Sequence, residues 1–118
     1  MFVGVLRLGL EVRGAHTLKD RRQAVLSVRD RIRSRFEVSA HELETGEDPQ
    51  RHTLIVTTAG GDAQRVRAVL DQCAAVARDH AVAQAAQVDV DVFRWHHDGE
   101  DWAARMMAEL GSPESADE

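Results

Sequence analysis

The chain has little cysteine, proline or aromatic side chain, and each shortage excludes a class of protein. Among 118 residues there are one cysteine, two prolines and no tyrosine. A single cysteine cannot form a disulfide within the chain, which excludes the small folds that disulfides hold together. With 43% hydrophobic residues, a chain of this length can bury a core without such links. The composition therefore indicates one globular domain.

Long apolar runs are also missing. The first fourteen residues have no basic segment ahead of their apolar residues, and Arg7 and Glu11 interrupt them. This pattern is neither that of a signal peptide nor that of a membrane span. We therefore expect no membrane partner and a cytoplasmic location.

Metal and catalytic patterns are absent as well. The densest group of potential metal ligands is residues 96–101, where two adjacent histidines precede three carboxylates. Neighbouring side chains at the end of a strand point in opposite directions, and no cysteine joins them, so we predict no metal site. No nucleophile, base and orienting group can be picked out together. We expect a non-enzymatic protein without catalytic residues or a cofactor.

What the chain does contain is a regular order of strands and helices. Residues 2–12 alternate as a strand, with Gly4, Leu6, Leu8, Leu10 and Val12 facing inward. Residues 17–36 repeat with the period of a helix, whose apolar stripe is Leu18, Val25, Val28, Ile32 and Phe36. Thr17 is a natural N-cap, and Asp20 completes a capping box. The start of this helix is therefore well defined.

Three further strands and a second helix complete the order. Residues 37–44 form a modest strand, and residues 52–59 carry β-branched side chains on both faces, which predicts a central strand. A helix starts after Asp62 and ends near His80, with Cys73 on its apolar face as a buried thiol. Residues 87–94 alternate valine with aspartate or phenylalanine, typical of a strand.

This order predicts an α+β, ferredoxin-like βαββαβ domain over residues 1–94. Two helices would cover one face of a four-stranded antiparallel sheet. The other face would show Val3, Val5, Thr53, Ile55 and Phe93, which is too apolar to stay in contact with water as one patch. A second copy of the protein, or the C-terminal segment, should cover it.

The C-terminal segment is the other candidate cover. In residues 95–111, the side chains of Trp102, Met106 and Leu110 recur at helical spacing, which predicts a short amphipathic helix. It could pack on its own sheet, on a dimer partner or on another protein, with Trp102 and Met106 in the contact. Residues 112–118 are small and acidic, and we expect this tail to be disordered.

The charge distribution singles out the first helix. Between Arg13 and Arg35 there are eight basic residues and two aspartates, although the whole chain carries a net charge of −5. One interpretation is a solvated face whose arginine stems cover the edge of the core. The other is a binding surface for phosphates or for an acidic partner. Its candidate residues are Lys19, Arg21, Arg22, Arg29 and Arg33.

Several stretches together resemble the YlxP-like family of small uncharacterised bacterial proteins. They are the start MFVGVLRLGLEVRGAHTLKDRR, then RIRSRF, the following FxVS and the late VDVDV. The resemblance covers roughly residues 1–94 and is strongest from Val3 to Ser39. In the helix signature the matching residues are Leu18, Lys19, Arg21 and Arg22. Two places depart from the family's pattern: Glu37 replaces the usual asparagine, and GEDPQR replaces a tryptophan-containing stretch.

The resemblance implies a ferredoxin-like fold and no established activity. Genes of such proteins often lie beside genes for translation initiation and ribosome maturation, which implies a role near the ribosome or its RNA. Two functions therefore stay open. The protein is either an accessory protein that binds ribosomal RNA or the ribosome through its first helix, or a homodimeric module that binds an acidic or amphipathic protein. RNA recognition by the sheet face is disfavoured, because its central strands carry no aromatic side chain to stack on bases.

Overall fold

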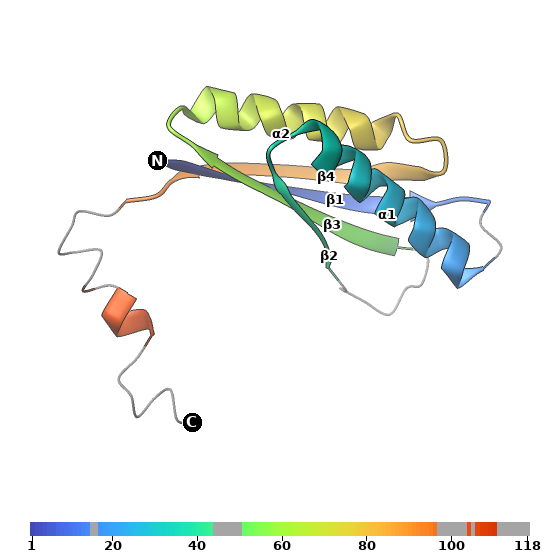
Figure 1. The fold of residues 1–118 in the computed structure, drawn as a ribbon, viewed down its shortest axis with the longest axis horizontal. Helices are drawn as coiled ribbons and strands as arrows, with labels where there is room; N and C mark the ends of the chain where they lie inside the picture. The colour runs from blue at the N-terminus through green and yellow to red at the C-terminus, as the bar shows by residue number, and fades with distance from the viewer. Residues whose placement is uncertain (15–16, 44–50, 97–103, 105, 111–118) are drawn as a thin grey trace.

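The structure is a computed structural model that describes residues 1–14, 17–43, 51–96, 104 and 106–110. The six predicted elements occur in the predicted order (Figure 1). They are β1 (Phe2–Val12), α1 (Leu18–Arg35), β2 (Ser39–Leu43), β3 (Arg51–Gly60), α2 (Ala63–Arg78) and β4 (Ala83–Arg94).

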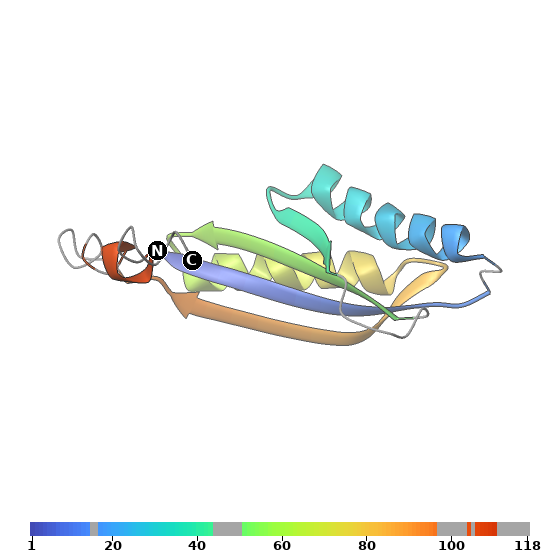
Figure 2. The ribbon, with the colours of Figure 1, turned by 90° about the horizontal axis from the view of Figure 1, so that it is seen from below.

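The four strands form one antiparallel sheet in the order β2-β3-β1-β4, so β3 and β1 are central. α2 lies along β4, β1 and β3, and α1 packs mainly on β2 and against α2. In Figure 2 the strands lie in front of α2, so the viewer looks towards the face that α2 does not cover. The predicted ferredoxin-like α+β fold, with both helices on one face, is confirmed.

The core lies between the helices and the sheet, on the inward faces that the alternation predicts. Leu6, Leu8 and Leu10 of β1 are fully buried, and they lie beside the buried Leu54 and Val56 of β3. The helices complete the core with the buried side chains Val25, Val28, Ile32, Val66, Leu70, Cys73, Ala74 and Ala77. This burial of apolar surface is the main force that stabilises the domain.

Glycine at position 4 permits the close approach of α2 to β1. A Cβ atom on Gly4 would lie 2.6 Å from side-chain carbons of Leu70 and Val66. Both of those side chains are buried, so neither can move aside freely. The small residue therefore sets the distance between this end of α2 and the centre of the sheet.

Both helices begin with the predicted caps. The Thr17 hydroxyl accepts a hydrogen bond from the Asp20 N–H at 3.0 Å, and the Asp62 carboxylate accepts one from the Gln64 N–H at 2.9 Å. Each bond satisfies one of the N–H groups that a helix start leaves without an internal partner.

The start of one strand and one predicted core position differ from the sequence prediction. β4 begins at Ala83 rather than near Gln87, because Ala83 and Ala85 pair with the end of β1 beyond an irregularity between Gly9 and Leu10. The predicted inward position of Leu18 is wrong, since this side chain is 53% exposed. The buried residues of α1 lie between Val25 and Ile32, so its first turn contributes nothing to the core.

The predicted C-terminal helix is present as a short turn at residues 104 and 106–109. Met106 is half-buried, whereas Met107 and Leu110 are 72% and 67% exposed. Figure 1 shows this turn beyond the end of the sheet rather than over it. Trp102 and the tail 112–118 lie outside the described residues. Within the described part of the chain, no helix is long and apolar enough to cross a membrane.

Candidate functional site

The basic surface of α1 lies on the outer layer of the domain. One side of the helix is buried through Val25, Val28 and Ile32, and the other side faces solvent. The helix holds seven basic residues and two aspartates, in a chain with a net charge of −5. Most of the positive charge of the N-terminal third therefore lies on one helix in the outer layer of the domain.

The five predicted binding residues are distributed unevenly over this helix. Lys19, Arg22 and Arg33 are exposed, whereas Arg21 and Arg29 are half-buried. The Nε of Arg21 is buried without a hydrogen-bond partner. These residues share one helix, but they do not form one uniform row of exposed cations.

Arg29 and Arg33 are engaged within the protein. The Arg29 Nε and Nη2 atoms both donate to Asp30 Oδ1, at 3.1 and 3.0 Å. The Arg33 guanidinium donates to the backbone carbonyl of Ala40, which joins α1 to β2. Because a guanidinium has five N–H donors, each of these arginines keeps donors for a ligand. The Arg33 bond holds α1 against β2, whereas the Arg29 pair lies within α1.

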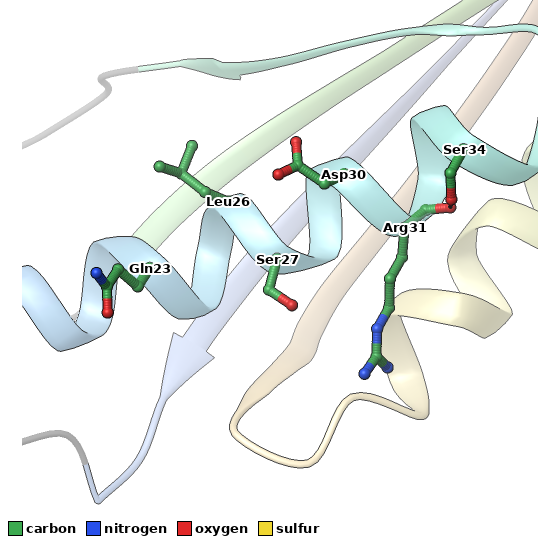
Figure 3. A pocket seen from close by; sticks show the side chains of 6 residues that line it. All are labelled: Gln23, Leu26, Ser27, Asp30, Arg31 and Ser34. Carbon is green, nitrogen blue, oxygen red and sulfur yellow. Dashed lines mark hydrogen bonds between the residues drawn. The ribbon is translucent and has the colours of Figure 1, made fainter.

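Arg31 and Arg35 flank the other side of α1 and are not among the five predicted binding residues. Together with Gln72, Val76 and Asp79 they line a shallow hollow between α1 and α2. Figure 3 shows Arg31 extending from α1 towards the end of α2. Arg31 and Arg35 are both exposed, and neither side chain forms a hydrogen bond or ion pair with a described residue. They are the arginines of α1 that remain most available to an external anion.

Sequence reasoning missed His80, which lies beside this hollow. Its Nδ1 accepts hydrogen bonds from the N–H groups of Val82 and Ala83 at 3.2 and 3.0 Å, and its Nε2 lies 3.3 Å from the hydroxyl of Ser27 on α1. Burial, and secondarily the positive charge of Arg31, lowers the pKa of His80. A neutral imidazole therefore joins α1 to the turn before β4. In the sequence, only the position of His80 just after a helix could have indicated this role.

The second candidate surface is the face of the sheet that the helices leave open. The strand register places Val3 beside Phe93 and Arg7 beside Ile55, with Val5 between them on β1. The predicted interface residues Val3, Val5, Ile55 and Phe93 thus share one face. Met1 and Trp95, whose backbones are joined by a hydrogen bond of 2.9 Å, extend this apolar end and are 54% and 41% exposed.

Cys73 and His52 are two further potentially reactive side chains among the described residues. Cys73 is fully buried, and desolvation raises the pKa of its thiol to about 11, so it is neither a nucleophile nor a thiolate ligand at neutral pH. His52 Nδ1 lies 3.3 Å from Glu42 Oε1 on the helix side of the sheet. No group of three or more potential metal ligands occurs among the described residues. His97, Asp98, Glu100 and Asp101 lie outside them.

The sequence of residues 3–90 matches the family described as Protein of unknown function (DUF503). The chain belongs to this family. The matched region contains all of α1 and most of the sheet, whereas Phe93, Trp95 and the C-terminal extension follow it. No match was found among curated proteins.

Two solved structures have a similar arrangement of elements. One is a mutant of SnoaB, a cofactor-independent oxygenase from Streptomyces nogalater, at 13% identity and a TM-score of 0.47, covering 82% of this chain and 95% of that chain. The other is a C-terminal segment of the alpha subunit of aIF2 from Pyrococcus abyssi, at 15% identity and a TM-score of 0.41, covering 83% of this chain and 52% of that chain. At these values neither likeness carries a functional argument.

Proposed function

We propose that this protein is a non-enzymatic accessory protein that binds RNA through the exposed basic side chains of α1. The observation that carries the proposal is the segregation of charge. A solvent-facing helix with seven basic residues and two aspartates belongs to an acidic chain. Such a local basic surface attracts a polyanion, although the molecule as a whole would repel one.

The available cations indicate how RNA would be contacted. Arg31 and Arg35 are one helical turn apart, about 6 Å along the axis, and both are exposed. Lys19 extends the basic surface at the start of the helix. Arginine fits phosphate oxygens with two parallel N–H donors. The contact would therefore be with the backbone of the RNA, tolerant of sequence and sensitive to salt.

The open face of the sheet supports this choice of surface. RNA-recognition modules of similar topology stack bases on aromatic side chains of their central strands. On the open face, β1 carries Val3, Val5, Arg7, Gly9 and Glu11, none of which is aromatic. β3 carries threonines, Ile55 and Ala59 on that face. Base stacking on this sheet is therefore disfavoured, and α1 is the better candidate.

The resemblance to the YlxP-like family supports ribosomal RNA as the first probe, because genes of such proteins often lie beside translation genes. The test is a titration of labelled ribosomal RNA fragments, followed by fluorescence anisotropy over a series of salt concentrations. The variant is Arg31→Glu with Arg35→Glu, which leaves the hydrogen bonds of Arg29 and Arg33 intact. We expect weaker binding and a log–log salt slope smaller by about 0.7–0.9 for each phosphate group that the variant no longer binds.

A matched control separates the helix from the overall charge. Arg65→Glu with Arg67→Glu on α2 makes the same change in net charge at exposed positions. RNA binding that weakens equally in both variants would mean that no specific surface exists. Flat titrations of the wild type at low salt would refute RNA binding, and α1 would then be tested against acidic proteins.

A further inference from the structure

The open face of the sheet has an apolar end and a charged centre. Its apolar end consists of Met1, Val3, Phe93 and Trp95, of which Phe93 is 41% exposed. The centre holds Arg7 on β1, with Asp89 beside it and Asp91 two residues further along β4. Positive and negative charges therefore stand on neighbouring strands of the same face.

Arg7 and Asp91 form no ion pair within the described part of the protomer. Arg7 is exposed, and its side chain forms no hydrogen bond or ion pair there, although Asp89 is its register partner on β4. The Asp91 side chain is exposed and likewise has no such contact, and Asp89 accepts one bond from the Gln87 side chain at 3.1 Å. The face thus offers an unpaired cation and two carboxylates beside an apolar patch.

We propose that a second copy of the chain covers this face and forms a two-fold symmetric dimer. An isologous interface needs a surface that complements itself after rotation by 180°. A two-fold axis that runs along the strands between β1 and β4 lays β1 of each copy over β4 of the other. Because Arg7 and Asp89 are register partners and lie side by side in one sheet, this rotation brings Arg7 of one protomer over the partner's Asp89. The two-fold symmetry repeats the same contact in the other half of the interface.

The stacking distance and the position of Arg7 suit this pairing. Face-to-face sheets pack about 10 Å apart, a gap that a long arginine and a short aspartate can span together. Arg7 is the middle residue of β1. Packed sheets cross at about 30°, so facing residues diverge most at the ends of the strands and least in the middle. The Arg7–Asp89 pair is therefore displaced least. The side chains of Val3 and Phe93 pack at the apolar end.

The area suits a weak dimer. β1 and β4 have 11 and 12 residues, which is about 36 Å of strand at 3.3 Å per residue. A strip that includes these strands and half of β3 is about 12 Å wide, so each copy loses about 430 Å² of surface. The total of about 900 Å² is just below the lower limit of about 1,000 Å² for stable specific interfaces and is typical of a weak one. The dimer should therefore dissociate on dilution.

This proposal does not depend on RNA binding. α1 packs on the core side of the sheet through Val25, Val28 and Ile32, so its exposed basic side chains stay accessible in the dimer. A foreign protein could also cover the apolar end of this face. In that case, nothing would require Arg7 and Asp89 to stand where a two-fold rotation brings opposite charges together. The register of β1 and β4 therefore favours a second copy.

The test is sedimentation velocity of the full chain over a wide range of concentration. We expect a reversible monomer–dimer equilibrium in the wild type. Arg7→Asp and Asp89→Arg should each weaken dimerisation at least about tenfold, because like charges then face each other in both halves of the interface. Arg67→Asp and Asp71→Arg on α2 are controls with the same changes in charge at exposed positions, and they should leave the equilibrium unchanged.

Mixing the two single variants distinguishes pairing between copies from pairing within one sheet. In a heterodimer of the Arg7→Asp and Asp89→Arg chains, the side chain at position 7 of each chain again faces the opposite charge at position 89 of the other. We expect the equimolar mixture to regain dimer, as two differently labelled chains that sediment together. Far-UV circular dichroism of each variant confirms that the fold is retained.

A third variant tests the apolar end. Phe93→Ser changes a side chain that is already 41% exposed, so it should weaken the dimer without unfolding the protomer. A wild type that stays monomeric at the highest concentration would overturn the proposal. So would a dimer that none of the three variants weakens, or single variants that dissociate and fail to associate when mixed.

Discussion

Replacing His80 tests whether this side chain holds the turn before β4. The imidazole accepts hydrogen bonds from the N–H groups of Val82 and Ala83. Its Nε2 also lies within hydrogen-bond distance of the Ser27 hydroxyl on α1. His80→Ala removes these interactions. Val82 is 40% exposed, so water can replace the bond to its N–H, but Ala83 is fully buried. The N–H of Ala83 is therefore the group left without a partner.

The expected cost follows from that single group. A buried N–H without a partner costs about 1–3 kcal/mol, and the small cavity left by the imidazole adds to it. We expect His80→Ala to lower the free energy of unfolding by about 2–3 kcal/mol. For a domain of this size, this corresponds to a fall in melting temperature of about 10–20 °C. His80→Asn should retain most of the stability at pH 7, because an asparagine oxygen accepts bonds from N–H groups just ahead in the chain.

The pH dependence provides a second measurement. Burial lowers the pKa of His80 in the folded protein, so above the ordinary value of about 6.5 both the folded and the unfolded chain are neutral at this residue. Below that value the unfolded chain takes up a proton first, and the stability from neutral His80 is lost as the pH falls through the folded pKa. Urea unfolding of the wild type should therefore show a fall in stability below pH 6.5 that His80→Asn lacks.

Either of two results would contradict this account. His80→Ala could unfold at the same urea concentration as the wild type, which would mean that Ala83 finds another acceptor. Alternatively, the curves of stability against pH for the wild type and for His80→Asn could run parallel, and the loss at low pH would then belong to other groups.

The remaining predictions concern packing, capping and the thiol. Gly4→Ala should destabilise the domain by about 1–3 kcal/mol, because its Cβ would overlap the buried side chains of Leu70 and Val66. In urea unfolding, the double variant with Leu70→Ala should lose less stability than the sum of the two single variants. Thr17→Ala should cost about 1 kcal/mol through loss of the cap on α1, and Thr17→Ser should restore most of it. Cys73, with a pKa of about 11, should react with a thiol reagent at pH 8 only as fast as the chain unfolds, so rapid labelling of the native protein would contradict its burial.

The sequence was sufficient to predict the fold because its strands and helices follow strong periodicities. The strict alternation in residues 2–12 correctly places Leu6 and Leu8 in the core, and the period of 3.6 does the same for Val28 in α1. Residues 83–86, AQAA, are rich in alanine, which favours helices over strands. Their strand conformation depends on pairing with the end of β1, a tertiary contact that local sequence does not show.

The candidate site was less predictable because its side chains contact distant or unexpected partners. A helical wheel shows Arg33 beside the apolar stripe but cannot show that the carbonyl of Ala40 lies within its reach. It also gives no reason to pair Arg29 with Asp30, since adjacent residues on a helix do not face each other. The structure leaves the roles of both arginines in binding as predictions, and it draws attention to Arg31 and Arg35 instead.

The position of β1 has a consequence for synthesis of the protein. β1 is the first of the four strands to be translated, but it lies in the middle of the sheet, between β3 and β4. Until Ala83–Arg94 has left the ribosome, the nascent chain has no partner for one edge of its central strand. An unpaired edge is a template for association with other strands, and pairing of the first strand with the last is slow because it closes a long loop. The domain should therefore become resistant to protease only after Arg94 has emerged, and chains that stall before Ala83 should be captured by chaperones or degraded.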